Sequence, residues 1–299
     1  MSNSSFSQNP YEARLITSDI HNFWTTFDKA DGVIGEDRIK IFEEGYFQNG
    51  SIGLQDFIEL RIKSAASLVE TIDKHPRFYR SIRESTLQVD KMKPDIERFF
   101  VNLKSIYPDA IFPDVYFLIG RMNSGGTGSS NGSLIGTEMH GRTEKMSLDE
   151  LSSWHRQVLK PIEEIPFIVI HELIHFQQTY LGRCHNLLEQ SIKEGAADFV
   201  GEIVSGEHIN KHLYRYGDSH ERELWRKFLQ EMKGQDFSKW LFNGTQAKEY
   251  PADLGYFIGY KICESYYGKL ADKHKAVWDI LNIQDFEGFL HTSQYGEGF

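Results

Sequence analysis

The spacing of apolar residues predicts helices along the first third of the chain. From residue 17 to about residue 73, apolar side chains recur at intervals of three and four, with glycine-containing turns at 31–32 and 49–50. A further helix is predicted over 94–106, because proline suits a first helical turn and Pro108 ends the pattern. We therefore expect the N-terminal third to be helical.

The pattern changes in the middle of the chain. Residues 115–119 are β-branched and aromatic, which favours a strand, and residues 133–137 are the candidate return strand of a long hairpin. The Gly-rich segment 124–132 lacks the Gly-Lys-Ser/Thr and GxGxxG patterns of phosphate-binding loops, so we interpret it as a connecting loop or lid. Helices are predicted again at about 161–180, 188–204, 225–232, 256–267 and 276–281. The expected class is α+β, mainly helical, with a small sheet.

Length and composition are those of an ordinary globular protein. The 299 residues are 40% hydrophobic, which is enough to build a well-buried core. We interpret residues 1–14 as a polar tail and residues 15–299 as one domain. Within that domain, residues 15–110 form an N-terminal helical part and residues 111–299 form the core that carries the chemistry.

Charge and apolar runs exclude two classes of partner. The chain has 33 Lys and Arg against 43 Asp and Glu, a formal charge of −10, and an acidic chain without a long basic run is not expected to bind nucleic acid. The longest apolar run, 165–170, is far shorter than the ~20 residues of a membrane span. The first residues lack the basic and apolar regions of a signal peptide. The expectation is a cytoplasmic protein, or an exported, periplasmic one whose targeting segment was removed.

One motif carries chemistry. Residues 171–175 read His-Glu-Leu-Ile-His, and on a helix two residues four apart differ by about 40° in azimuth. His171 and His175 therefore project from one face and can reach a single zinc ion, while Glu172 is placed to contact a water on that ion. Ordinary core histidines are the alternative. Among isoleucines, however, they would bury polar groups without evident partners, so we favour a metal site.

The next predicted helix supplies a third ligand. Glu194 and Asp198 lie four apart on one face, and the small residues 195–197 between them allow a close approach of another helix. The 18 residues between His175 and Glu194 leave room for a turn and an antiparallel partner helix. Glu194 can then complete a His₂Glu site whose fourth position is open to water. Asp198, one turn further on, can accept a proton from the back of a zinc-bound histidine and fix its tautomer.

Other third ligands fit the sequence less well. A metzincin would have glycine and histidine at the positions of Gln178 and Leu181, so that class is excluded. Cys184 and His185 are alternatives, but they fall in the expected turn between the two helices.

Taken together, these residues resemble the gluzincin metallopeptidases, which combine a histidine pair in HExxH with a glutamate on a following helix. More narrowly, segments 187–200 and 253–262 and the opening 16–24 are similar to a bacterial family of predicted zinc-dependent proteases related to gliding-motility lipoprotein B. This resemblance covers nearly the whole chain. The lipoprotein relatives carry an export signal with a lipidated cysteine, which this sequence lacks.

The resemblance implies a zincin-like core made of the HExxH helix, the glutamate helix and a small antiparallel sheet. It also implies an edge strand that binds the substrate backbone, for which 115–119 with 133–137 is the candidate.

The function we expect is zinc-dependent hydrolysis of peptide bonds in a peptide or protein substrate, with Zn²⁺ as cofactor and Glu172 as general base. Tyr256 and Tyr260, four apart on a glycine-bearing helix, are candidates for stabilising the developing oxyanion. Weaker candidates for that role are His140, His212 and His220. Two other functions stay open: a non-catalytic assembly or adhesion protein held together by zinc, and a hydrolase of a non-peptide amide or ester.

Overall fold

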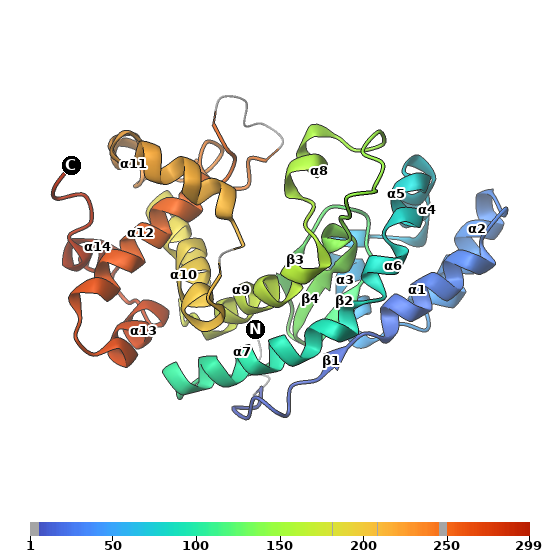
Figure 1. Ribbon diagram of the computed structural model, residues 1–299, viewed down its shortest axis with the longest axis horizontal. Coiled ribbons are helices and arrows are strands. Elements are labelled where there is room, and N and C mark those ends of the chain that lie inside the picture. Colours follow the sequence, from blue (N-terminus) through green and yellow to red (C-terminus); the bar gives the residue numbers. More distant parts are fainter. Residues whose placement is uncertain (1–5, 181, 208, 245–249) are drawn as a thin grey trace. The chain divides into compact units, whose positions relative to one another are not determined.

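A computed structural model describes residues 6–180, 182–207, 209–244 and 250–299 of the chain (Figure 1). The chain forms two compact units. One contains residues 1–100 and 111–172, and the other contains residues 101–110 and 173–299. The assignment of residues 15–299 to one domain stays a prediction.

The first unit combines a small sheet with short helices. Its strands are β1 (Leu15–Ile16), β2 (Val115–Leu118), β3 (Gly126–Gly128) and β4 (Ser133–Gly136). Its helices are α1 (Ser18–Lys29), α2 (Gly35–Phe42), α3 (Ile52–Phe57), α4 (Ala65–Lys74), α5 (Pro76–Ser81), α6 (Arg83–Thr86) and α8 (Ser153–Val158). Helices α7 (Lys93–Ile106) and α9 (Ile165–Gln177) have residues in both units. Short π-helical turns cover Glu43–Phe47 and Ile58–Ile62, and 3₁₀ turns cover Val89–Met92, Thr137–His140 and Ile162–Glu164.

The sheet is mixed and has the strand order β1-β2-β4-β3 (Figure 1). Strands β1, β2 and β4 are parallel, and β3 is antiparallel to β4. The predicted antiparallel hairpin of 115–119 with 133–137 is therefore wrong, as is a purely antiparallel sheet. The reason is that the segment interpreted as a loop, 124–132, contains β3. This strand forms the hairpin with β4 and leaves the opposite edge of β4 to pair in parallel with β2. The prediction of a mainly helical α+β class is confirmed.

Helix α1 builds the core of the first unit in the way its sequence pattern predicts. The four apolar residues of the pattern are buried: Ile20, Phe23, Trp24 and Phe27. The ring of Phe23 packs edge-on against Tyr46, with centroids 5.3 Å apart. The Tyr46 hydroxyl donates to the carbonyl of Ile119 at 2.8 Å, directly after β2. A buried aromatic residue thus ties the helical layer to the end of a central strand.

The residues before β1 also contact the sheet. The amide of Phe112 donates to the carbonyl of Ser7 at 2.7 Å, an isolated antiparallel bridge. Arg14 donates from its backbone amide and from Nε to the carboxylate of Asp114, at 2.8 and 3.0 Å. The described part of the predicted polar tail is therefore anchored beside β2.

The second unit is helical. Its helices, besides residues of α7 and α9, are α10 (Leu187–Ser205), α11 (Lys211–Glu231), α12 (Leu254–Lys269), α13 (Lys273–Leu281) and α14 (Phe286–Ser293). Helices α10 and α12 lie side by side and approach to backbone contact. A Cβ atom on Gly195 would overlap the backbone of Tyr260, and one on Gly259 would overlap the carbonyl of Ser191. The small residues that the sequence places on α10 thus allow the predicted close approach.

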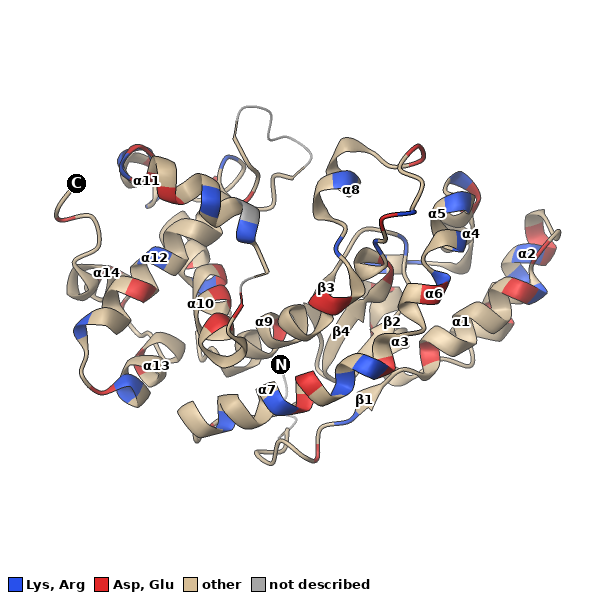
Figure 2. Cartoon of the chain, viewed as in Figure 1, with Lys and Arg blue, Asp and Glu red and all other residues tan. Residues whose placement is uncertain are grey.

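Among the described residues, no helix has both the length and the apolar character that crossing a membrane requires. Figure 2 shows acidic and basic residues interspersed along α2, α7 and α11.

Candidate metal centre

Helix α9 carries the HExxH residues. Pro166 occupies its first turn, and His171 is buried with 5% of its surface exposed, while Glu172 and His175 are half-buried. Its apolar residues are buried: Ile165, Val169, Ile170, Leu173 and Ile174. A helix surrounded in this way keeps its two histidines away from bulk water.

Helix α10 has well-formed ends and a buried acidic face. Its N-cap is Asn186, whose Oδ1 accepts from the backbone amide of Glu189 at 3.0 Å, and it ends at Gly206 with a left-handed φ of 82°. Glu194 and Asp198 are only 5% and 3% exposed. Buried carboxylates need hydrogen bonds or counter-charges, so this face is not an ordinary solvated surface.

The two helices bring three donor groups together. His171, His175 and Glu194 each offer one ligand atom, and these atoms all lie within 4.8 Å of one another. The Nε2 atom of His175 lies 3.2 Å from Oε2 of Glu194. Two imidazoles and one carboxylate are a ligand set that zinc takes in catalytic sites, so the residues fit the metal that the sequence implies. In the described part of the chain, these three are the group that could hold a metal ion.

The Glu194 carboxylate is shared among several neighbours. Its Oε1 atom lies 2.9 Å from the ammonium of Lys193, and Tyr256 of α12 forms a hydrogen bond with it. Burial is the main reason that the pKa of Tyr256 is raised well above its usual value. Nearby carboxylates raise this pKa further, and Glu194 has the largest effect among them. The Tyr256 hydroxyl therefore lies beside the predicted third ligand.

Asp198 accepts hydrogen bonds from the start of α11. Its Oδ2 atom accepts from Nδ2 of Asn210 and from the hydroxyl of Tyr214, both at 2.9 Å. Burial, followed by the charge of Asp198, raises the pKa of Tyr214 well above its usual value. The role of Asp198 toward a zinc-bound histidine stays a prediction.

Tyr260, the second oxyanion candidate, has a different partner. Its hydroxyl donates to the carboxylate of Glu202, and its ring packs against Phe199 and Tyr214. Burial and then this hydrogen bond raise its pKa above the usual value. The structure therefore pairs Tyr256 with Glu194 and the hydroxyl of Tyr260 with Glu202.

The remaining sequence candidates are placed as follows. His140 is buried with 4% exposed, and a Cβ atom on Gly125 would lie 3.4 Å from its Nε2. The Nδ1 atom of His220 is 2.9 Å from the carbonyl of Tyr216 on the same helix.

The thiol of Cys184 donates to the carbonyl of Tyr180 at 3.7 Å, and burial raises its pKa to about 11. His185 lines a surface pocket of about 580 Å³. The side chain of His212 lies outside the described residues.

Glu172 lies against the edge strand of the sheet. A Cβ atom on Gly126 would lie 2.6 Å from Oε1 of Glu172 and 2.9 Å from its Cγ, so a side chain at this position would displace the Glu172 carboxylate. Strand β3 is held by its ladder to β4 and by Arg61, whose Nη2 donates to the hydroxyl of Thr127 at 3.0 Å. Sequence reasoning missed this contact. The run of glycines at 125–128 was its only signal, and a flexible loop has the same signature.

Two further buried polar groups follow β4. Burial raises the pKa of Glu138 to about 7, and burial lowers the pKa of His140 to about 4. Glu138 accepts from the backbone amide of Met122 at 3.1 Å. Burial therefore shifts both side chains toward their neutral forms, and nothing in the sequence pattern singled out Glu138.

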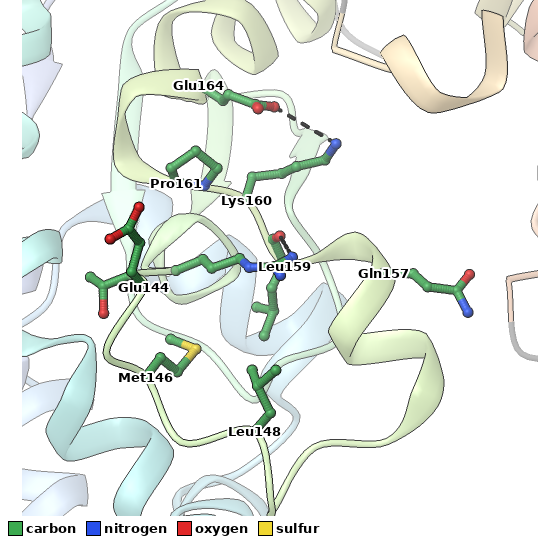
Figure 3. A pocket seen from close by; sticks show the side chains of 10 residues that line it. Glu144, Met146, Leu148, Gln157, Leu159, Lys160, Pro161 and Glu164 are labelled. Atoms are coloured by element: carbon green, nitrogen blue, oxygen red, sulfur yellow. Dashed lines mark hydrogen bonds and ion pairs between the residues drawn. The ribbon is translucent and has the colours of Figure 1, made fainter. Parts of the chain in front are cut away.

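A pocket of about 430 Å³ lies in the first unit, between the segments 142–148 and 157–164 (Figure 3). Charges of both signs line it, and its Lys160 ammonium is 3.8 Å from Glu164. None of the three metal-binding candidates is among its lining residues. The pocket lies ahead of α9 in the chain and does not form the candidate centre.

A family model described as gliding motility protein GldB matches residues 16–297. Searches of the curated proteins and of the solved structures find no significant match. The match includes α9, α10 and α12, and so the whole candidate centre. It confirms the resemblance to gliding-motility lipoprotein B that the sequence segments predicted.

Proposed function

The chain belongs to the gliding motility protein GldB family, and from the geometry of its candidate metal centre we propose that it is a zinc-dependent hydrolase of peptide bonds. The observation that carries the proposal is the convergence of His171, His175 and Glu194 on α9 and α10. Glu172 follows the first of these ligands and lies against an edge strand. This arrangement is the one a metal hydrolase of the gluzincin type requires.

The finer fold assignment belongs to the same proposal. An HExxH helix, a glutamate helix and a sheet with one antiparallel edge strand support a zincin-like core. Strand β3, rather than the predicted pair 115–119 and 133–137, is then the edge that faces a substrate backbone.

Each residue of the candidate site has a separate role in the proposed hydrolysis. When bound, zinc supplies Lewis acidity toward a carbonyl oxygen and toward water. Glu172 accepts a proton at its carboxylate and returns it to the leaving amine. Tyr256, whose hydroxyl forms a hydrogen bond with Glu194, donates toward developing negative charge. Lys193, at 2.9 Å from Glu194, reduces the negative charge that the third ligand presents to the metal.

The family description favours a second candidate function. It names gliding motility and no chemistry, which supports a non-catalytic component in which a metal ion ties α9 to α10. The family name also carries a lipoprotein label, which supports an exported setting for this chain. A hydrolase of a non-peptide amide or ester uses the same ligands and is separated from a peptidase only by its substrates.

The test compares Glu172→Gln with the control Glu163→Gln, which changes an exposed glutamate shortly before α9. We expect both variants and the wild type to contain stoichiometric zinc by elemental analysis, because Glu172 is not a ligand. Hydrolysis of casein and of a peptide library should be lost in Glu172→Gln alone. Wild-type digestion by Glu172→Gln would contradict the mechanism. Zinc in the wild type without hydrolysis of any amide or ester would favour the assembly role.

A further inference from the structure

We propose that Gln178 is a positioning residue for the metal: it fixes the ring and the proton of His175 so that Nε2 is the ligand atom. This inference rests on the proposed metal site and deepens it. Gln178 directly follows the last residue of α9 and is buried with only 4% exposed. In the sequence, Gln178 served only to exclude a metzincin.

Besides a hydrogen bond with the side chain of Tyr180, the Gln178 amide has two partners that determine its orientation. Its Nε2 lies 2.7 Å from the backbone carbonyl of Lys193, which can only accept, so the nitrogen must point there. Its Oε1 therefore faces Nδ1 of His175, at 2.9 Å. Because a carbonyl oxygen only accepts hydrogen bonds, Nδ1 of His175 must carry a proton.

This assignment has a consequence at the other ring nitrogen. In the neutral imidazole with a proton on Nδ1, the lone pair is on Nε2, and Nε2 lies 3.2 Å from Oε2 of Glu194. Two electron-rich atoms facing each other at this distance are stabilised by a cation that both can bind. The hydrogen bond from His175 to Gln178 thus prepares the pair to receive a metal ion.

The same amide couples the two ligand-bearing helices. Lys193 directly precedes Glu194, so one side chain contacts the ring of the second ligand and the backbone beside the third. A shift of α10 along its axis would break the bond to Lys193 and release the ring of His175. Asp198, which the sequence favoured for the outer partner, accepts from Asn210 and Tyr214 in the bonds described above, and its role toward a histidine stays a prediction.

The neighbouring Gln177 provides a matched control. It is equally buried, at 4% exposed, and its amide also donates to a carbonyl, that of Leu173 at 2.9 Å on its own helix. Replacing either glutamine by methionine removes one buried amide of the same size at the same helix end. General destabilisation should therefore be similar in Gln177→Met and Gln178→Met, whereas an effect on the metal should belong to Gln178 alone.

The experiment measures the zinc dissociation constant of the full chain by competition with a chelator. Loss of an outer partner weakens metal binding by about 10–100-fold, and we expect that loss in Gln178→Met, with Gln177→Met within twofold of wild type. Gln178→Glu keeps an acceptor for Nδ1 but loses the donor to the Lys193 carbonyl, so its affinity should lie between those of wild type and Gln178→Met. In the metal-free protein, ¹⁵N NMR should show His175 protonated at Nδ1 in the wild type and a shift toward the Nε2-protonated tautomer in Gln178→Met.

The outcomes separate the two proposals. A wild type that takes up no zinc overturns the metal site and the proposed function. If the wild type binds zinc and the zinc dissociation constant of Gln178→Met is within twofold of the wild-type value, the role of Gln178 is overturned. The metal site itself is then unaffected. Equal losses in Gln177→Met and Gln178→Met, or no recovery in Gln178→Glu, also overturn it.

Discussion

Helices α10 and α12 hold two tyrosine–glutamate pairs that are chemically alike but differently surrounded. Tyr256 pairs with Glu194, and Tyr260, one turn further along α12, pairs with Glu202. Burial raises the pKa of both tyrosines. Only Glu194 lies beside the histidines of α9, whereas the ring of Tyr260 packs against other aromatic rings. A raised tyrosine pKa therefore reflects burial in both pairs and does not tell them apart. What distinguishes the pair at the candidate metal centre is that its glutamate converges with two histidines.

The largest expected difference between the pairs is in metal affinity. Glu194→Gln removes a ligand, so its zinc affinity should fall by more than the roughly 100-fold upper range of outer-partner losses. Glu202→Gln changes the equivalent carboxylate of the other pair and should bind zinc within twofold of wild type. Isothermal titration with zinc checks both. Equal affinity in the two variants would remove the distinction between the pairs.

The next difference is in turnover. Tyr256→Phe removes a hydroxyl beside Glu194, and loss of one donor to a developing oxyanion lowers kcat by about 100-fold. Tyr260→Phe removes a hydroxyl from Glu202, so it should change stability by about 1 kcal/mol and leave kcat near wild type. Peptide hydrolysis at saturating substrate, with zinc content as a check on loading, measures both. A similar fall in kcat in both variants would show that the pairs act alike.

The smallest expected effect is on stability, at the backbone contact between α10 and α12, the two helices that carry both pairs. Gly259→Ala adds a Cβ atom that overlaps the carbonyl of Ser191, so it should lower the free energy of unfolding by about 1–3 kcal/mol. Gly268→Ala, on the same helix, meets nothing within 4 Å and should raise it by up to about 1 kcal/mol. Urea unfolding gives both values. An unchanged stability in Gly259→Ala would contradict backbone contact between α10 and α12.

The long apolar patterns were sufficient to predict much of the helical structure. The stripe of α1, the proline at the start of α7 and the apolar runs of α9 and α12 lie where the sequence predicted helices. Helix α11 was predicted only from Trp225 onward, because its first half is rich in charged and polar residues. Helix α14 was missed, since its eight residues are too few to establish a period.

The sheet and the outer parts of the site depend on contacts that no local pattern encodes. Which edge of β4 pairs with β2 is decided by tertiary packing, so the parallel register could not be predicted. His171, His175 and Glu194 could be proposed because helical spacing fixes the first two and chain length allows the third. Gln178 and Gly126 could not be proposed, because the importance of each depends on a distant neighbour. Lys193 lies 15 residues after Gln178, and Glu172 lies 46 residues after Gly126.

The composition of β3 limits what the sheet edge can recognise. Two of its three residues are glycines, so the edge offers amide and carbonyl groups with hardly any side chains. Main-chain groups are the same in every polypeptide, and an extended segment aligned there would be held with little regard to its sequence. Any preference for particular residues around a cleaved bond would have to come from other surfaces. We therefore expect digests of mixed peptides to show cleavage at many different sequences.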